Sequence, residues 1–542
     1  MLTTNRLFRR VGARFRPSLY VLGAFGHLGS LFKIRHFGCN NTDNDSYLQI
    51  HASLAGISRC NADAVPLNVM QTERYIAAAD LGSSKVALCV AKVDGEETNV
   101  IYYKEEPSDG VQYSRVVHPR RVAVPLQKLV QDAEAELNIK IRQLVVGLPR
   151  YELRQVVATA RVDRSDPESL ITREEVNSLK ASAVETYPME DAVREEIYGA
   201  VAQSFSADED FAGVSETDIV GVTADKIDGN FKLYIGARKP VSNLDIMFNG
   251  MGLAIARKMF APDAVASAVL TETERFNGVA LVEIGAGVTS LSIYRGKVLR
   301  HFSSIPFGGW SITNDVALEC GFDEQLAENI KLAFGACMPT KLQSLSDKIL
   351  QINDEETGSY EQLTINHLSE IITARSKEII EAILYNLQDS GYADNIRSGI
   401  VLTGGGANLI NFSLLLRDMS GYKVRIGFPR RQAFSAFGCS DIFETGAGTA
   451  VGMVLEARRD VRLNCAEDQG MPAEEDAQAV ETAPSELFPP TGGGVIVPPA
   501  GGRKTQPEGN IVTWLGRTSK KAEAAAKKAF EKTLGNLFDD MN

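Results

Sequence analysis

The sequence lacks long apolar runs, paired cysteines and an excess of positive charge. No stretch of its 542 residues approaches the ~20 consecutive apolar residues that a membrane-spanning helix needs. The seven cysteines are scattered, odd in number and without CxxC spacing, which argues against a zinc site or a disulfide framework and favours reduced thiols in a cytosolic protein. The formal charge of −12 argues against nucleic acid as a partner, because a general nucleic-acid binder needs a basic face.

A glycine-tipped hairpin is predicted between Gly278 and Gly296. The apolar run 279–282 predicts a buried strand, and a second apolar run, 291–294, follows after the turn Gly285-Ala286-Gly287. Glycine suits a turn whose backbone amides approach an anion closely, because it has no Cβ and tolerates positive φ. Taken alone, the pattern also fits an ordinary turn.

Two other segments complement this hairpin. Residues 75–90 repeat its plan, with an apolar strand, the acidic Asp80, a Gly/Ser turn and a second apolar strand. Residues 399–409 predict a buried strand that runs into a glycine turn and then a helix. Two such hairpins facing each other could hold the phosphates of a nucleotide between them. In order and spacing, the three segments resemble the phosphate-one, phosphate-two and adenosine motifs of the actin, Hsp70 and sugar-kinase superfamily. The resemblance implies an α/β, actin-like (ribonuclease H-like) two-domain ATPase fold.

Within that superfamily, residues from about Met70 to Ala457 are most similar to the FtsA family of bacterial cell division proteins. The segments that carry the resemblance are 282–287, 298–301, 305–309, 312–317, 327–331, 399–406 and 424–427. The resemblance implies an ATP-binding adaptor that polymerises on the cytoplasmic face of the inner membrane at the division site. Such an adaptor anchors the ring of the tubulin-like protein FtsZ through the FtsZ C-terminal peptide, and helps recruit later division proteins.

The same resemblance assigns the residues of a nucleotide site. Asp80 would hold Mg²⁺ through water, as Mg²⁺ prefers. The residues expected to contact the phosphates from the two hairpins are Gly82, Ser83, Ser84 and Lys85 on one side and Gly285, Ala286, Gly287 and Val288 on the other. The residues expected beside the ribose and adenine are Glu328 and Lys331, with Gly404, Gly405 and Asn408 as the wall of the adenosine pocket.

The second hairpin departs from the superfamily pattern Asp-Ile-Gly-Gly-Gly-Thr-x-Asp. Here Glu283 replaces the first Asp, Val288 the Thr and Ser290 the last Asp, and Ala286 replaces a Gly. Phosphoryl transfer depends on positioning the attacking water and stabilising charge. We therefore expect ATP binding with slow or undetectable hydrolysis, with Glu283 as the candidate catalytic residue.

The chain is long enough for several domains, since single cores stop growing near ~250–300 residues. The expected order is a first actin-like domain over 70–151 and 230–275, interrupted by an FtsA-type interaction subdomain over 152–229, and a second actin-like domain over 276–459. In the subdomain, Thr172 and Glu175 predict a capping box at a helix start. The small residues of 444–452 predict a helix that can cross another closely. This segment resembles the second connecting helix of the superfamily, which implies a role in the hinge between the domains.

An accessory lobe is expected over about 342–388. The FtsA resemblance makes this lobe the receptor of the FtsZ C-terminal peptide, and Arg375 matches a family arginine there. A solvated surface arginine is the alternative.

The C-terminal region is expected to be a disordered linker over 460–510 followed by an amphipathic helix over 511–542. The apolar residues on one face of that helix are Phe530, Leu534, Leu537, Phe538 and Met541. Flanking lysines suit an anionic membrane surface, whereas docking on a protein remains the alternative.

Residues 1–69 do not resemble the family. They contain no acidic residue before position 43 but six arginines and one lysine, which also fits a signal or transit peptide. Because secretion would separate an ATP-dependent protein from its nucleotide, we expect a misassigned or disordered extension, with translation starting at Met70.

Three other members of the superfamily are the competing assignments. A sugar or acetate kinase would need a substrate-binding carboxylate or histidine in the interdomain cleft and no membrane helix. An Hsp70-like chaperone would need a β-rich domain after the ATPase domain, where this chain has a linker. A pilus-assembly actin relative shares the inserted subdomain and is the nearest competitor, and localisation to mid-cell would separate the two.

Overall fold

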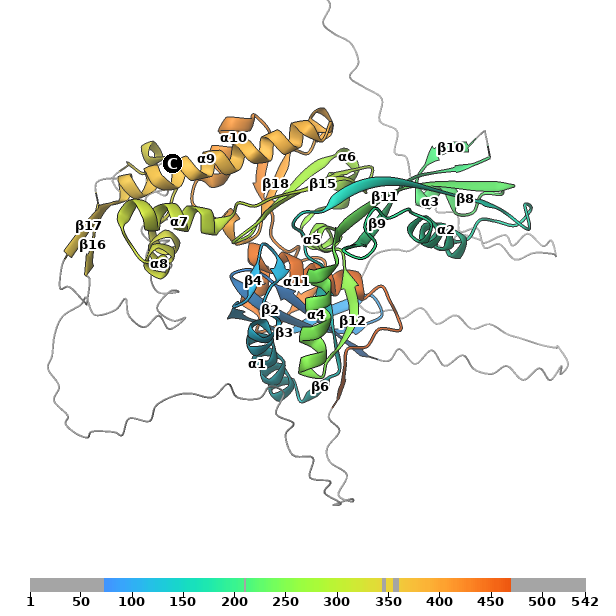
Figure 1. The fold of residues 1–542 in the computed structure, drawn as a ribbon, viewed down its shortest axis with the longest axis horizontal. Coiled ribbons are helices and arrows are strands. Elements are labelled where there is room, and N and C mark those ends of the chain that lie inside the picture. The colour runs from blue at the N-terminus through green and yellow to red at the C-terminus, as the bar shows by residue number, and fades with distance from the viewer. Residues whose placement is uncertain (1–72, 209–210, 344–347, 354–359, 469–542) are drawn as a thin grey trace, which may run out of the picture. The chain divides into compact units, whose positions relative to one another are not determined.

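The computed structural model describes residues 73–208, 211–343, 348–353 and 360–468 (Figure 1). The predictions for residues 1–69, for the linker beyond 468 and for the terminal helix that carries Phe530, Leu534, Leu537, Phe538 and Met541 lie outside these described residues. Among the described helices, none combines the length and apolarity needed to cross a membrane.

Two sheets of the same plan form the centre of the fold. The first has the order β12-β7-β1-β2-β3, with the short β20 added beside β3, and the second has the order β15-β14-β13-β18-β19. In both, three antiparallel strands of a meander are followed by two strands parallel to the first of them. The strands are β1 (Arg74–Leu81), β2 (Lys85–Asp94), β3 (Glu97–Pro107), β7 (Gln143–Gly147), β12 (Ala254–Met259), β20 (Ser435–Ala436), β13 (Val279–Ile284), β14 (Thr289–Arg295), β15 (Val298–Ile305), β18 (Ile400–Thr403) and β19 (Val424–Ile426). This duplication confirms the predicted actin-like α/β fold.

Amphipathic helices cover each sheet. On the first, α1 (Pro119–Leu137) packs against α4 (Arg238–Met251) and strands β2 and β3. On the second, α9 (Ile365–Asp389) contacts β14 and β15 and lies between α7 (Gly309–Cys320) and α10 (Phe412–Ser420). The other elements around this sheet are α6 (Glu272–Asn277), α8 (Glu324–Phe334), and the paired strands β16 (Ile349–Asn353) and β17 (Tyr360–Thr364).

An additional sheet interrupts the first domain. It has the order β10-β9-β11-β8 and consists of β8 (Arg154–Asp163), β9 (Glu195–Ala207), β10 (Phe211–Val214) and β11 (Lys226–Ala237). It has its own core, in which Phe205 and Phe231 meet edge to face, covered by α2 (Arg173–Glu185) and α3 (Glu216–Ile219). The predicted capping box is confirmed, since the Glu175 amide donates to Thr172 Oγ1 at 3.2 Å.

One predicted boundary is wrong. The strand around residues 231–236 belongs to the inserted sheet and not to the first actin-like domain, because β11 pairs with both β8 and β9 along this stretch. The insertion therefore extends to residue 237.

The segment after residue 459 also differs from the prediction of a linker that starts at 460. β21 (Ala466–Asp468) pairs with β6 (Ile139–Ile141), and the buried Cys465 donates its amide to Tyr75 O at 2.7 Å. The Arg74 guanidinium donates to the carbonyls of residues 458, 460 and 463. Backbone pairing of this kind leaves no hydrophobic periodicity in the sequence, so residues 460–468 read as a linker although they dock on the first sheet.

Two helices cross in the interior so closely that their backbones are in contact. α11 (Gly448–Ala457) is buried along almost its whole length and packs against α5 (Ala261–Val269). A Cβ at Gly452 would lie 1.8 Å from the carbonyl oxygen of Ala264, so no residue other than glycine fits the crossing. The small-residue helix predicted over 444–452 takes part in this close crossing, although the α-helix itself spans Gly448–Ala457 and residues 445–447 form a 3-10 turn before it. The remaining short elements are β4 (Val111–Gln112), β5 (Arg115–Val116), η1 (Pro339–Lys341), η3 (Ala393–Asn395), η4 (Gly405–Asn408), η5 (Ser440–Phe443) and η6 (Thr445–Ala447).

The substitution Gly452→Ala tests the crossing. Alanine in place of glycine ordinarily stabilises a helix by ~1 kcal/mol. Here the added methyl collides with backbone that cannot rotate away, so we expect a loss of about 2 kcal/mol or more in the free energy of unfolding, measured with denaturant. The matched control is Gly405→Ala, where a Cβ meets nothing within 4 Å. A Gly452→Ala protein as stable as the native chain would contradict the crossing.

Candidate nucleotide-binding site

The structure brings the three glycine turns together. A Cβ on Gly287, in the turn between β13 and β14, would lie 3.3 Å from Ser83 Oγ, in the turn between β1 and β2. The third turn follows β18, and a Cβ on its first residue, Gly404, would lie 2.5 Å from the carbonyl oxygen of Ile284. Segments about 200 and 120 residues apart in sequence therefore border one site, as their motifs predict.

The two hairpin turns are built alike. Each is closed by one backbone bond, from Gly82 N to Lys85 O and from Gly285 N to Val288 O, both at 2.9 Å. Among the hydrogen bonds of the described residues, none uses an amide of 83–84 or of 286–287 as the donor. Each turn thus presents two adjacent unpaired amides, an arrangement that binds anionic oxygen atoms.

The third turn requires glycine for two reasons. Gly404 has a φ of +84°, and a Cβ on Gly406 would lie 2.4 Å from the Ile284 side chain. The Thr445 hydroxyl lies 2.9 Å from Gly404 O and 3.1 Å from Asn408 Oδ1, which joins η4 to η6. Gly405 faces open space, which suits the wall of a ligand site.

Glu328 and Lys331 lie beside the second turn. Lys331 is 8% exposed, and its Nζ lies 2.7 Å from Glu328 Oε2, 2.8 Å from Thr313 Oγ1 and 3.1 Å from Gly309 O. Burial lowers the pKa of Lys331, while the Glu328 carboxylate opposes that shift. The amide of Gly309 donates to Gly285 O at 2.9 Å, so this cluster supports the hairpin tip from the side of α7.

Lys85 is held by a carboxylate from the neighbouring strand. Its Nζ lies 2.5 Å from Glu105 Oε1, which also accepts the Tyr103 hydroxyl at 2.5 Å. A Cβ on Gly446 would lie 2.7 Å from the same Nζ, so Lys85 borders the third turn as well as the first. Lys85, the cation predicted beside the phosphates, therefore borders the turns, and its charge is paired with the carboxylate of Glu105.

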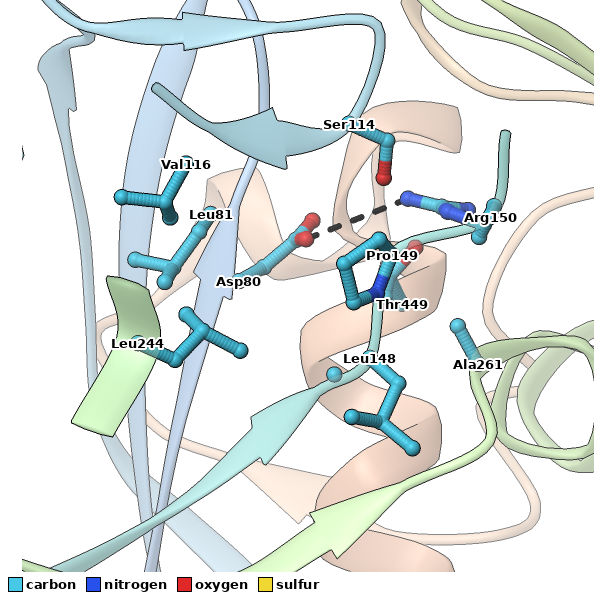
Figure 2. A pocket seen from close by; sticks show the side chains of 11 residues that line it. Asp80, Leu81, Ser114, Val116, Leu148, Pro149, Arg150, Leu244, Ala261 and Thr449 are labelled. Atoms are coloured by element: carbon cyan, nitrogen blue, oxygen red, sulfur yellow. Dashed lines mark ion pairs between the residues drawn. The ribbon is translucent and has the colours of Figure 1, made fainter. Parts of the chain in front are cut away.

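An arginine that the motifs do not predict bridges the two sheets. Arg150, which follows β7, donates to Glu283 Oε2 of β13, and its other terminal nitrogen lies 4.0 Å from Asp80 Oδ1 of β1 (Figure 2). Thr449 of α11 donates to the second Glu283 oxygen at 3.0 Å. The three charged side chains are only 13–15% exposed. The only indication of Arg150 in the sequence is its position directly after a predicted strand, because the end of a strand parallel to β1 must lie beside Asp80.

The electrostatics of this group follow from burial. Burial raises the pKa of Asp80 to about 6; the Arg150 guanidinium opposes the shift and the Glu283 carboxylate adds to it. Both oxygens of Glu283 already have partners, so the residue predicted as catalytic is engaged in pairing the two domains.

The arrangement does not fit Mg²⁺ between Asp80 and Glu283. Mg²⁺ binds through carboxylates and several retained waters, whereas here a guanidinium occupies the space between the two carboxylates. Among the described residues, no group of three or more possible ligands could hold a metal ion. The cavity beside Asp80, lined by Ser114, Leu148 and Thr449 among others, has a volume of about 10 Å³ and holds about one water, not a nucleotide (Figure 2).

Arg375, the candidate partner-binding residue, is paired within the chain. Its guanidinium makes a two-point contact with Asp315 of α7 at 2.6 and 2.9 Å and a third with Glu378 at 2.5 Å. A peptide carboxylate would have to compete with both of these residues.

Comparison with known proteins gives the class first. The duplicated sheets and the three converging turns define a protein of the actin-like superfamily. The family model "Cell division protein FtsA" matches residues 280–445. Cell division protein FtsA of Neisseria meningitidis serogroup B is 29% identical over 392 residues, which cover 71% of this chain and 91% of that protein. Those of Pseudomonas aeruginosa and Bacillus subtilis are 27% and 25% identical and cover 70% and 73% of this chain and 89% and 86% of their own lengths. Over most of its length the chain is therefore similar to the cell division proteins of the FtsA family.

Solved structures show weaker likeness. The PilM-PilN type IV pilus biogenesis complex matches with a TM-score of 0.47 and 16% identity, over 72% of this chain and 98% of that one. MreB5 of Spiroplasma citri bound to ADP matches with a TM-score of 0.41 and 13% identity, over 71% of this chain and 95% of that one.

The substitution Asp80→Asn tests the burial of this carboxyl. Because the folded-state pKa of about 6 exceeds the ordinary 3.8, the stability contribution of protonated Asp80 is complete below about pH 4 and is lost as the pH rises through 6. Asparagine stays neutral, so the stability of the variant relative to the native chain should rise between pH 4 and pH 7, by up to about 3 kcal/mol in denaturant unfolding.

The control is Asp228→Asn, since Arg161 lowers the pKa of Asp228 and that variant should lose relative stability over the acid range as the pH rises. A pH-independent difference between the native chain and Asp80→Asn would contradict the raised pKa.

Proposed function

We propose that the chain is an ATP-binding adaptor of the division machinery, with the nucleotide between the two hairpins. The observation that carries the proposal is the matched pair of turns, one on each of the duplicated sheets, with two unpaired amides apiece. The amides of Ser83 and Ser84 bind the phosphates from one side and those of Ala286 and Gly287 from the other. The adenosine is bordered by Gly404, Gly405 and Asn408. The second turn is supported by Glu328 and Lys331. The negative charge of the nucleotide joins the two hairpin turns and so the two domains.

We propose further that hydrolysis is slow. An attacking water needs an unpaired base, and Glu283 is paired with Arg150 and Thr449. Val288 and Ser290 lack the hydroxyl and carboxylate of the superfamily pattern at their positions. The same pairing weighs against a sugar kinase, which needs a free carboxylate for the substrate hydroxyl.

Steady-state phosphate release checks this. We expect a rate well below the ~1–100 s⁻¹ of kinases, measured with saturating ATP and the full chain, together with clear binding of a fluorescent ATP analogue. Turnover within the kinase range would contradict the adaptor assignment. Binding of neither ATP nor the analogue would remove the nucleotide site.

Partner contacts are proposed for the inserted sheet and for the surface formed by α7 and α8 together with the accessory lobe predicted over about 342–388. The insertion is an independently packed unit and suits contacts between copies in a filament. On the surface of α7 and α8, Leu318 and Leu332 are 81% and 60% exposed, which favours an apolar peptide contact. The FtsZ C-terminal peptide is the proposed occupant. A carboxylate of the peptide would pair with Arg375 by replacing the carboxylates of Asp315 and Glu378.

Membrane attachment is proposed for residues 511–542. We expect the full chain to sediment with anionic liposomes in the presence of ATP and to carry a labelled FtsZ tail peptide with it. A chain that ends at Glu508 should leave the peptide in the supernatant.

A matched control replaces Phe530 and Phe538 by serine in the full-length chain. If the truncated or the serine-substituted chain sediments as well as the native one, the terminal helix is not the membrane anchor. If no chain binds the peptide, the adaptor role fails, and mid-cell localisation then decides between division and pilus assembly.

A further inference from the structure

Arg150 is placed rigidly between the two actin-like domains. Its loop is anchored by Leu148, whose amide donates to Met259 O at 2.8 Å. Gly147 packs beside Met453 and Ala261, a residue from each of the crossing helices α11 and α5. Pro149 restricts the backbone immediately before the arginine. The guanidinium is thus held in place by the interior of the fold and not by a mobile surface loop.

The charges around Arg150 leave it a defined role. The carboxylates at the site are Asp80, Glu283 and Glu105, and the cations are Arg150 and Lys85. Lys85 is paired with Glu105 and acts on Asp80 only from a distance, whereas Arg150 lies within 4.0 Å of both Asp80 and Glu283. A buried carboxylate without a compensating cation is costly, and in related chemistry a divalent ion supplies that charge.

We propose that the guanidinium of Arg150 takes the place of a divalent metal, so that this chain binds ATP without Mg²⁺. The inference rests on the proposed nucleotide site and deepens it. A guanidinium stays charged at every physiological pH and carries five donors in a planar fork. The contact with Glu283 uses one terminal nitrogen, and Asp80 lies 4.0 Å from the other, so donors remain for phosphate oxygen. Unlike a metal ion, this cation is attached to the first domain and bound to the second.

The test measures affinity for the fluorescent probe mant-ATP by anisotropy, with the full chain in EDTA and in MgCl₂. For the native chain, we expect dissociation constants that agree within about threefold in the two buffers. For Arg150→Met, the freed carboxylates repel the phosphates, so we expect binding at least about tenfold weaker in EDTA, with a substantial part restored by MgCl₂. The change from metal independence to metal dependence is a signature that loss of a purely structural ion pair would not produce.

Two further variants keep the result interpretable. Arg154→Met removes an arginine four residues along the chain, paired with Glu190 and Glu195 away from the site, and should behave as the native chain does. Arg150→Lys keeps the charge and should retain metal-independent binding even if the methionine variant fails to fold.

The outcomes separate the two proposals. Native binding that needs Mg²⁺, with at least about tenfold loss in EDTA, would overturn the role of Arg150 and leave the nucleotide site standing. Native binding in neither buffer would overturn both. Equal, metal-independent binding by the native chain and by a folded Arg150→Met would show that another group supplies the charge, and would also overturn the inference.

Discussion

The crossing of α5 and α11 is the constraint on which the other contacts depend. Glycine at position 452 lets the two backbones meet where any Cβ would lie 1.8 Å from Ala264 O. With the helices this close, α11 contacts β1 and β7 of the first sheet, while its Thr449 donates to Glu283 of the second. The helix pair therefore forms a common wall for both sheets. A larger separation would part Glu283 from its hydroxyl donor and remove the surface on which Gly147 packs.

In the site beside these two helices, the charged side chains are paired with side chains of opposite charge. Lys331 with Glu328 and Arg150 with Glu283 are short, largely buried pairs, and Lys85 with Glu105 is a short pair that is about one third exposed. Buried charges persist only when they are paired, and a paired carboxylate is a poor base. What remains available to a ligand is backbone, namely the amides of the two hairpin turns and the glycines of the third. The proposed nucleotide would thus be held by backbone amides with no unpaired carboxylate base among these pairs, which is consistent with the proposed slow hydrolysis.

Local patterns in the sequence were sufficient for the parts of the site that each segment builds by itself. The hairpins at 75–90 and 279–294, the strand and turn at 399–409 and the capping box at Thr172 all depend on residues within about twenty positions of one another. Strand alternation, glycine at a tight turn and a hydroxyl before a helix act over that distance. For the same reason the small residues of 444–452 were enough to predict a close helix crossing, although not which helix is crossed.

The sequence by itself determined the resemblance to FtsA, the three glycine turns and the order of the elements that carry them, because each is encoded in contiguous residues. Only the tertiary structure decided that Arg150 lies between Asp80 and Glu283, since Arg150 and Glu283 are 133 residues apart and no local pattern links them. It also decided that Arg375 is already paired with Asp315, and that residues 460–468 complete an edge of the first domain. Backbone pairing and long-range ion pairs leave no periodic mark in a chain, so they become visible only when the folded sheets bring distant segments together.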